Sequence, residues 1–182
     1  MTLARVVSSA RAGRRRALAC ALAVVFPAAA ALFLFAAFGA ATVRNDSMSP
    51  TLRSGDTVLF DRWSPPARGD VVLLVDRERW SGTPDAVLVK RVIGIAGDVV
   101  VCCESGSGRL IVNGETVEEA YAGEERPGGG IPFRVTVPDD AVWVMGDNRA
   151  ESADSRLSVS KPGHGAVPRA DLRGTARAWW GW

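Results

Sequence analysis

A lysine in the middle of an apolar segment and a serine upstream of it are the first candidates for chemistry. Lys90 lies within Val87-Leu88-Val89-Lys90-Arg91-Val92-Ile93-Gly94, and Ser47 lies within Asn45-Asp46-Ser47-Met48-Ser49-Pro50. A lysine can act as a general base only if burial removes its proton near neutral pH. Alternation along a strand puts Leu88, Lys90 and Val92 on one face, which favours burial. The pair is consistent with a serine nucleophile and a lysine base. The alternatives are a lysine on a wet face and a serine in a linker.

A third segment combines serines with a high density of charge. It runs Gly146-Asp147-Asn148-Arg149-Ala150-Glu151-Ser152-Ala153-Asp154-Ser155-Arg156. Asp147 with Arg149, or Asp154 with Arg156, can form ion pairs that make a turn rigid. A solvated loop is the usual fate of such a composition. Buried ion pairs beside a reactive site are the alternative.

An uncharged stretch precedes Ser47 and must position it. Residues 17–43 contain 27 residues without a charge. As a helix they would measure about 40 Å, against a hydrocarbon core of about 30 Å. Arginines precede the stretch and the first acid is Asp46, which places the N-terminus in the cytoplasm. We therefore expect a basic cytoplasmic segment over 1–16, a single transmembrane helix over 17–43 and an extracytoplasmic domain over 44–182. A cleaved signal peptide fits less well, because its apolar region usually has 7–15 residues.

After residue 44, short apolar runs alternate with turn residues. Strands are expected at Asp56–Phe60, Asp70–Val75, Val87–Ala96, Val99–Cys103, Arg109–Val112, Phe133–Val137, Ala141–Met145 and Gly174–Trp179. Asn113-Gly114 is a strong signal for a two-residue hairpin turn. No helix-period pattern of useful length follows residue 44. The sequence therefore predicts an all-β, barrel-like or folded-sheet domain on one membrane helix.

Charge and composition exclude several classes of function. The formal net charge is only +2 and no basic stripe with interleaved aromatics is present, so we expect no nucleic-acid partner. His164 is the only histidine, and no Cys/His cluster suggests a metal. Cys102 and Cys103 are adjacent. A vicinal disulfide needs a strained local geometry, so two separate thiols are favoured, although the sequence does not fix the redox state.

Four segments, in order, resemble the conserved boxes of bacterial type I signal peptidases, which are serine peptidases with a Ser–Lys dyad. They are Ser47–Leu52, Arg68–Val72, Lys90–Asp98 and Gly146–Arg156. One such box is weak, but four in sequence are very specific, and the match extends over most of residues 44–176. The resemblance implies a signal-peptidase/LexA-like β-fold catalytic domain, in agreement with the strand pattern.

By motif position, the resemblance implies that Ser47 is the nucleophile and Lys90 the general base, with no metal or organic cofactor. The supporting residues that it implies are Ser152, which orients the lysine, the ion pair Asp154 and Arg156, and Asp147 in the same shell. The family builds its oxyanion hole from the nucleophile's own N–H and a side chain two residues earlier. Here that side chain is Asn45, whose amide can donate.

The resemblance also implies a function. It is the removal of signal peptides from exported preproteins at the outer surface of the cell membrane, with small side chains at the first and third positions before the cut. Signal peptides and membrane lipid are then the partners. A dedicated maturation protease for one specific precursor is the alternative. Trp179, Trp180 and Trp182 at the chain end either complete a core strand or lie at the membrane interface, where indoles are favoured.

Overall fold

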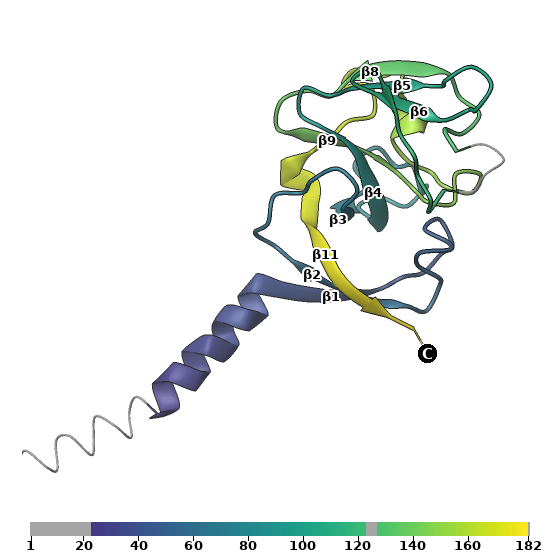
Figure 1. Ribbon diagram of the computed structural model, residues 1–182. Helices are drawn as coiled ribbons and strands as arrows, with labels where there is room; N and C mark the ends of the chain where they lie inside the picture. Colours follow the sequence, from purple (N-terminus) through teal and green to yellow (C-terminus); the bar gives the residue numbers. More distant parts are fainter. Residues whose placement is uncertain (1–22, 123–126, 182) are drawn as a thin grey trace, which may run out of the picture. The chain divides into compact units, whose positions relative to one another are not determined.

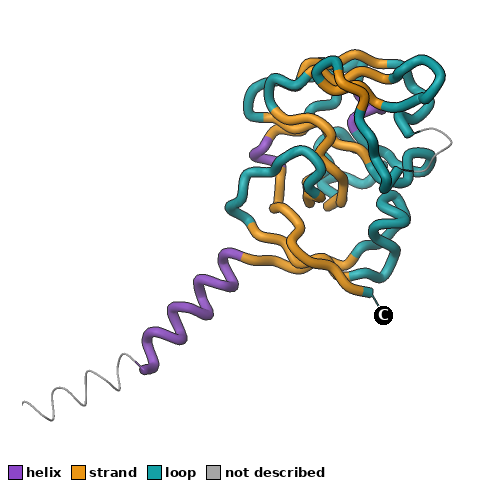
Figure 2. Tube along the Cα trace, viewed as in Figure 1, coloured by secondary structure: helices purple, strands orange, loops and turns teal. Residues whose placement is uncertain are grey.

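The computed structural model of this 182-residue chain describes residues 23–122 and 127–181. The chain divides into two compact units, Met1–Phe38 and Gly39–Trp182. In the first unit, the described residues 23–37 form a helix. The expected cytoplasmic segment 1–16 and the first residues of the expected span lie outside the described residues. In the second unit, strands and loops dominate (Figure 2), with two short 3-10 turns, η1 (Ser155–Ser158) and η2 (Arg169–Asp171).

The expected membrane span over 17–43 differs from the structure at its C-terminal end. Phe38–Thr42 form strand β1, and the helix before it ends at residue 37. An apolar edge strand that follows an apolar helix continues the same uncharged run, so periodicity alone does not separate the two. Within residues 23–122 and 127–181, no helix has the length and apolar character that crossing a bilayer requires.

The second unit is built from two antiparallel sheets. The larger has the order β1-β2-β11-β3-β4-β9-β10, and the smaller has the order β7-β6-β5-β8. Figure 1 shows β5, β6 and β8 at one end of this unit and β2 with β11 at the other. The bounds are β2 Thr57–Asp61, β3 Val71–Val75, β4 Val87–Ile95, β5 Val99–Cys102, β6 Leu110–Val112, β7 Glu115–Thr116, β8 Phe133–Thr136, β9 Ala141–Met145, β10 Val167–Pro168 and β11 Leu172–Trp180. The prediction of a mostly β fold is confirmed.

The hairpin turn predicted at Asn113-Gly114 is present. Asn113 and Gly114 have φ angles of 55° and 89°, the positive values that a type I′ turn requires at both positions. The turn joins β6 to β7, with Val112 opposite Glu115. All eight expected strands are found, whereas β10 was not expected, because two residues carry no readable alternation.

Strand β4 lies between β3 and β9 and carries the candidate lysine into the core. Lys90 is opposite Val72 on β3, and Arg91 is opposite Met145 on β9. The β4–β9 register shifts between Val92 and Gly94. A Cβ on Gly94 would lie 2.8 Å from a methyl carbon of Val100, so the glycine permits the smaller sheet to approach β4 closely. Both neighbouring strands are completely buried, which leaves the middle of β4 little access to water.

Candidate active site

Ser47 lies in the turn between β1 and β2. Two apolar side chains after it, Met48 and Leu52, are fully buried in a cluster with Val58 and Leu73. The Leu52 N–H donates to the Met48 carbonyl at 2.9 Å, which closes the turn. Ser47 itself is only 6% exposed. The apolar residues of the first sequence box therefore anchor the turn, and the anchored turn fixes the serine.

The structure brings Ser47 and Lys90 together. The Lys90 Nζ donates to the Ser47 Oγ at 2.6 Å. The lysine is 2% exposed, and Leu88 and Val92 on the same strand face are buried with it. The expectation that alternation buries Lys90 is confirmed. A hydroxyl in contact with a buried amine is the arrangement that a serine nucleophile with a lysine base requires.

Burial lowers the pKa of Lys90 from 10.5 to about 8. The negative charge of Asp154 opposes this by raising the pKa, and the positive charge of Arg156 lowers it again. Desolvation has the largest effect because the lysine has no carboxylate bound to it in the structure, and a buried ammonium without such a partner loses its hydration uncompensated. A substantial fraction of Lys90 is therefore neutral slightly above neutral pH.

The charged segment 146–156 follows β9 and is buried where it faces the dyad. Arg156 donates to both carboxylate oxygens of Asp154 at 2.8 Å, and the Gly146 N–H donates to Asp154 Oδ2 at 3.0 Å. Asp154 is 0% and Arg156 5% exposed. The predicted Asp154–Arg156 ion pair is therefore present. It is buried, so this part of the segment is not a solvated loop.

The other ion pair considered from the sequence, Asp147 with Arg149, is not the one that the structure contains. Asp147 accepts from Arg91 Nε and Nη2 at 2.8 and 2.6 Å, and from Thr51 Oγ1 at 2.5 Å. The sheet register explains this choice, because Arg91 is opposite Met145 and Asp147 follows two residues later. Asp147 thereby joins the Ser47 turn, β4 and the segment after β9.

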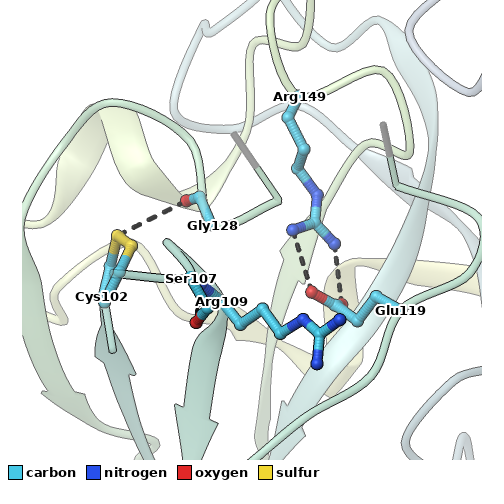
Figure 3. The surroundings of a disulfide bond; sticks show 7 residues. Cys102, Ser107, Arg109, Glu119, Gly128 and Arg149 are labelled. Carbon is cyan, nitrogen blue, oxygen red and sulfur yellow. Dashed lines mark hydrogen bonds and ion pairs between the residues drawn. A yellow bond between two sulfur atoms is a disulfide. The ribbon is translucent and has the colours of Figure 1, made fainter. Parts of the chain in front are cut away.

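Arg149 binds a residue that the sequence did not single out. Its Nη1 and Nη2 donate to the Glu119 carboxylate at 3.0 and 2.7 Å (Figure 3). The Tyr121 hydroxyl donates to the same carboxylate at 2.7 Å, and the Arg91 guanidinium lies 3.9 Å from the centre of the Tyr121 ring. Burial raises the pKa of Tyr121, so its hydroxyl remains a donor. Only the need of a buried arginine for a carboxylate could have pointed to Glu119.

Ser152 lies against the Ser47 backbone across a glycine, Gly146. A Cβ on Gly146 would be 2.3 Å from the Ser152 Oγ and 2.3 Å from the Ser47 carbonyl oxygen. Among the described residues, the Ser152 Oγ is the buried side-chain polar atom without a hydrogen-bond partner. A buried hydroxyl of this kind is costly unless a partner arrives. Gly146 is therefore required for the close approach of Ser152 to the Ser47 backbone. The Ser152 hydroxyl is able to accept a hydrogen bond from a further donor.

Asn45 is beside Ser47, with its side chain in the opposite role to the expected one. The Asn45 Oδ1 accepts from the Ser47 N–H at 3.3 Å, so the carboxamide presents its oxygen to the Ser47 amide, whereas the expected role needs its nitrogen as a donor. On the other side, the Asn148 N–H donates to the Ser47 carbonyl at 3.1 Å. The backbone of Ser47 is thus held from two directions.

Two pockets adjoin the turn that carries Ser47. The strand pocket has a volume of about 510 Å³, and its walls include Ala41, Val43, Ser47, Met48, Leu73 and Leu88. The loop pocket has a volume of about 730 Å³, and its walls include Ser49, Pro50, Gly129, Ile131, Ser152 and Leu157. Both volumes fall in the range of pockets that hold small ligands or short peptide segments. The two pockets share no wall residue, and each includes residues of the turn that carries Ser47.

Cys102 and Cys103 form a disulfide, so the expectation of two separate thiols is wrong. Strand β5 ends at Cys102, and the opposite facing of adjacent side chains holds only within a strand. The Cys102 Sγ lies 3.6 Å from the Gly128 carbonyl oxygen (Figure 3). Within the described parts of the chain, no group of three or more histidine, cysteine or acidic residues could hold a metal.

Comparison with known proteins identifies relatives across most of the chain. Residues 14–182 match the family model described as "Signal peptidase, peptidase S26". Signal peptidase I P of Bacillus subtilis subsp. natto is 32% identical over 155 residues, covering 79% of this chain and 75% of that protein. Signal peptidase I of Mycobacterium tuberculosis (strain H37Rv) is 33% identical over 184 residues, covering 74% of this chain and 62% of that protein. This chain therefore spans less than two thirds of the mycobacterial relative. A crystal structure of a signal peptidase I from Enterococcus faecalis V583 has a TM-score of 0.48 and 24% identity, covering 62% of this chain and 97% of that one.

Proposed function

Because the chain belongs to the signal peptidase family, peptidase S26, we propose that it is a membrane-anchored serine endopeptidase that removes signal peptides from exported preproteins at the outer membrane surface. The observation that carries this proposal is the 2.6 Å contact between the Lys90 amine and the Ser47 hydroxyl in a buried site. The related proteins named signal peptidase I support the substrate class.

In the first step, neutral Lys90 takes the proton from Ser47 as its Oγ attacks the scissile carbonyl carbon. A pKa of about 8 makes the neutral amine available at modest cost near neutral pH. The charges of Asp154 and Arg156 act in opposite directions on the lysine pKa, and burial has a larger effect than either. Burial is therefore the main cause of the lowered pKa of the Lys90 amine.

The carbonyl oxygen gains negative charge in this step and needs donors. The Ser47 N–H is one candidate, and Asn45 Oδ1 occupies it at 3.3 Å before substrate binds. In our proposal, the substrate oxygen displaces Asn45 Oδ1, and a half-turn of the carboxamide offers its NH₂ group instead. Asn45 is exposed, so no packing opposes that rotation.

Protonated Lys90 then gives its proton to the leaving amine, and the acyl group remains on Ser47. Water, deprotonated by Lys90, attacks the ester carbonyl and frees the serine hydroxyl. Each time Lys90 becomes cationic it needs acceptors, and the unpaired Ser152 Oγ is a candidate beside the site. Ser152 would therefore orient the amine and stabilise its charged form, which is the role that its motif position implies.

The strand pocket is suited to the residues before the cut. Its walls are mainly small and apolar side chains from β1, β3 and β4, including Ala41, Leu73 and Leu88. Shallow apolar walls accept small side chains and exclude large ones by steric overlap. This supports substrates with small residues at the first and third positions before the scissile bond.

Membrane attachment remains part of the proposal. The uncharged run over residues 17–37 has 21 residues, about the number that a helix needs to cross the hydrocarbon core. At the other end of the chain, Trp179 and Trp180 lie on β11 and are 43% and 48% exposed. Because these indoles do not complete the core, they are available for the membrane interface, where indoles are favoured.

The direct test uses the full chain purified in detergent with a preprotein and a panel of small secreted precursors. We expect cleavage of the preprotein after a small residue, and loss of that cleavage in Ser47→Ala. Cleavage of one precursor alone would favour the dedicated maturation protease. A Ser47→Ala variant that retains full turnover would contradict the proposed nucleophile.

A further inference from the structure

The loop pocket has no role in the steps above, although it adjoins the turn that carries Ser47. Ser49 and Pro50, which follow the nucleophile, form one of its walls, and Ser152 forms part of another. The Ser152 Oγ approaches the Ser47 carbonyl across Gly146. The loop pocket and the strand pocket therefore adjoin the same turn through different residues of it.

The side of the scissile bond that each pocket takes follows from the proposed function, on which this inference rests. Small residues before the cut fit the strand pocket, which is lined by Asn45, Ser47 and the start of β4. The chain after the cut must then leave in the other direction. That direction leads past Ser152 into the loop pocket, because Ser152 lines the loop pocket and is absent from the walls of the strand pocket.

The charged groups in the walls of the loop pocket are each neutralised. Arg149 is bound by Glu119, Arg156 by Asp154, and Asp147 by Arg91. Such pairs leave no surplus charge to attract an acidic or a basic side chain. A charged residue that entered would lose hydration without gaining a partner.

The remaining walls are apolar or without side chains. Ile131 and Leu157 are 37% and 52% exposed and both line the pocket, so they give its wall an apolar surface that a ligand can cover. Gly129 and Gly130 offer bare backbone between them. A Cβ on Gly129 would lie 2.2 Å from the Arg156 guanidinium, so this backbone is packed directly on the ion pair beside the dyad.

The glycine segment is also supported from behind. The Gly128 N–H donates to the Gly108 carbonyl at 2.8 Å. A Cβ on Gly128 would overlap the Cys103 Sγ at 2.3 Å, which places the disulfide directly against this glycine (Figure 3). The wall of the loop pocket is therefore held between the β5–β6 loop and Arg156, as expected for a preformed binding surface.

We propose that the loop pocket binds the first residues after the cut, the beginning of the released mature polypeptide, and selects uncharged segments with an aliphatic side chain that packs on Ile131 and Leu157. The chemical class of ligand is an extended, uncharged peptide. Its contribution is to orient the leaving amine beside Lys90, since positioning of a reacting group lowers the barrier to its reaction.

The test compares two substrates with identical residues before the cut. One continues for five residues after it, with leucine at the second of them, and the other ends in a small fluorogenic amine. The double variant Ile131→Ser, Leu157→Ser should lower kcat/KM for the long peptide about 10-fold, the usual effect of losing one aliphatic contact in a pocket. It should leave the short substrate unchanged.

Val87→Ser is the matched control, because Val87 is 52% exposed and lines the strand pocket. It should alter cleavage of the two substrates by the same factor. The thermal unfolding temperature of each variant serves as the control for the fold. We expect it to equal that of the parent chain, because the three substituted side chains are exposed. In the parent, replacing the leucine with lysine or with glutamate should reduce cleavage by similar factors.

The outcomes distinguish a failure of the loop-pocket assignment from a failure of the proposed function. Equal effects of the double variant on both substrates, or a strong preference for one sign of charge after the cut, would overturn the assignment of the loop pocket while leaving the proposed function intact. Failure of the parent chain to cleave either substrate would overturn the proposed function and this inference with it.

Discussion

Two neighbouring residues on β4 are buried cations with opposite surroundings. Lys90 faces Ser47 and has no bound carboxylate, whereas Arg91 faces the segment after β9 and is held by both oxygens of Asp147. Burial lowers the pKa of Lys90 to about 8, whereas the pKa of Arg91 is raised by Asp147 despite its burial. The paired cation, Arg91, keeps its charge, whereas the unpaired cation, Lys90, has the lowered pKa that our proposed general base requires. On one strand, the residue that is bound by a carboxylate supports the structure of the site, and its neighbour without a carboxylate is the candidate for proton transfer.

The largest expected effect is on turnover. Ser47→Ala and Lys90→Met should each lower kcat by about 10⁴-fold or more, and the double variant should be no worse than either single variant, because the pair acts as a unit. The readout is cleavage of a preprotein by the purified chain. His164→Ala is the control and should retain activity. A loss in His164→Ala comparable to that in Lys90→Met would point to a histidine base.

The second expected effect separates the two cations by stability. Arg91→Met leaves Asp147 buried without its partner and should lower the free energy of unfolding by about 3–5 kcal/mol. Lys90→Met removes the cost of burying an amine and should raise it at pH 7 by about 1–3 kcal/mol, since each pKa unit corresponds to 1.36 kcal/mol and the Ser47 hydroxyl loses a partner. Urea unfolding of both variants measures the contrast.

The sign of the pH dependence follows from the lowered pKa. The folded chain binds fewer protons at Lys90 than the unfolded chain between about pH 8 and 10.5. The free energy of unfolding therefore rises with pH in that window. The advantage of Lys90→Met should be greatest below pH 8 and should fade toward pH 10.5. An advantage independent of pH would mean that packing, and not charge burial, is its cause.

The third expected effect is on the rate profile. With chemistry limiting, kcat should rise about tenfold per pH unit below pH 8 and level off above it, because only the neutral amine accepts the proton. A profile that is flat from pH 6 to pH 9 would contradict a lysine base.

The smallest expected effect concerns Glu119, which we expect to act as a positioning residue through Arg149. Glu119→Gln keeps the size of the side chain but weakens the hold on Arg149, whose Nε donates to the Gly146 carbonyl. We expect kcat to fall about 5-fold with KM unchanged, and Glu119→Asp to recover part of the loss. An unchanged kcat, or a loss that follows unfolding at the assay temperature, would reduce Glu119 to a structural role.

The sequence predicted the parts of the molecule that depend on local pattern. The strands, the hairpin at Asn113-Gly114 and the burial of Lys90 follow from alternation and turn chemistry, and the four boxes identified the family correctly. The boundary between helix and β1 was missed because both are uncharged. The partners of Asp147 and Arg149 were missed because sheet register and a distant loop decide them, and neither leaves a mark within the 146–156 segment.

The pKa of Lys90 itself tests the central claim most directly. The chain contains only two lysines, Lys90 and Lys161, and Lys161 is half exposed beside Glu78. A chain labelled with ¹³C at lysine Cε therefore gives two NMR signals, and Lys161→Arg assigns them. We predict that the Lys90 signal titrates near pH 8, well below the ordinary lysine value of about 10.4. A Lys90 signal that titrates near 10.4 would contradict the account of Lys90 as a base made by burial.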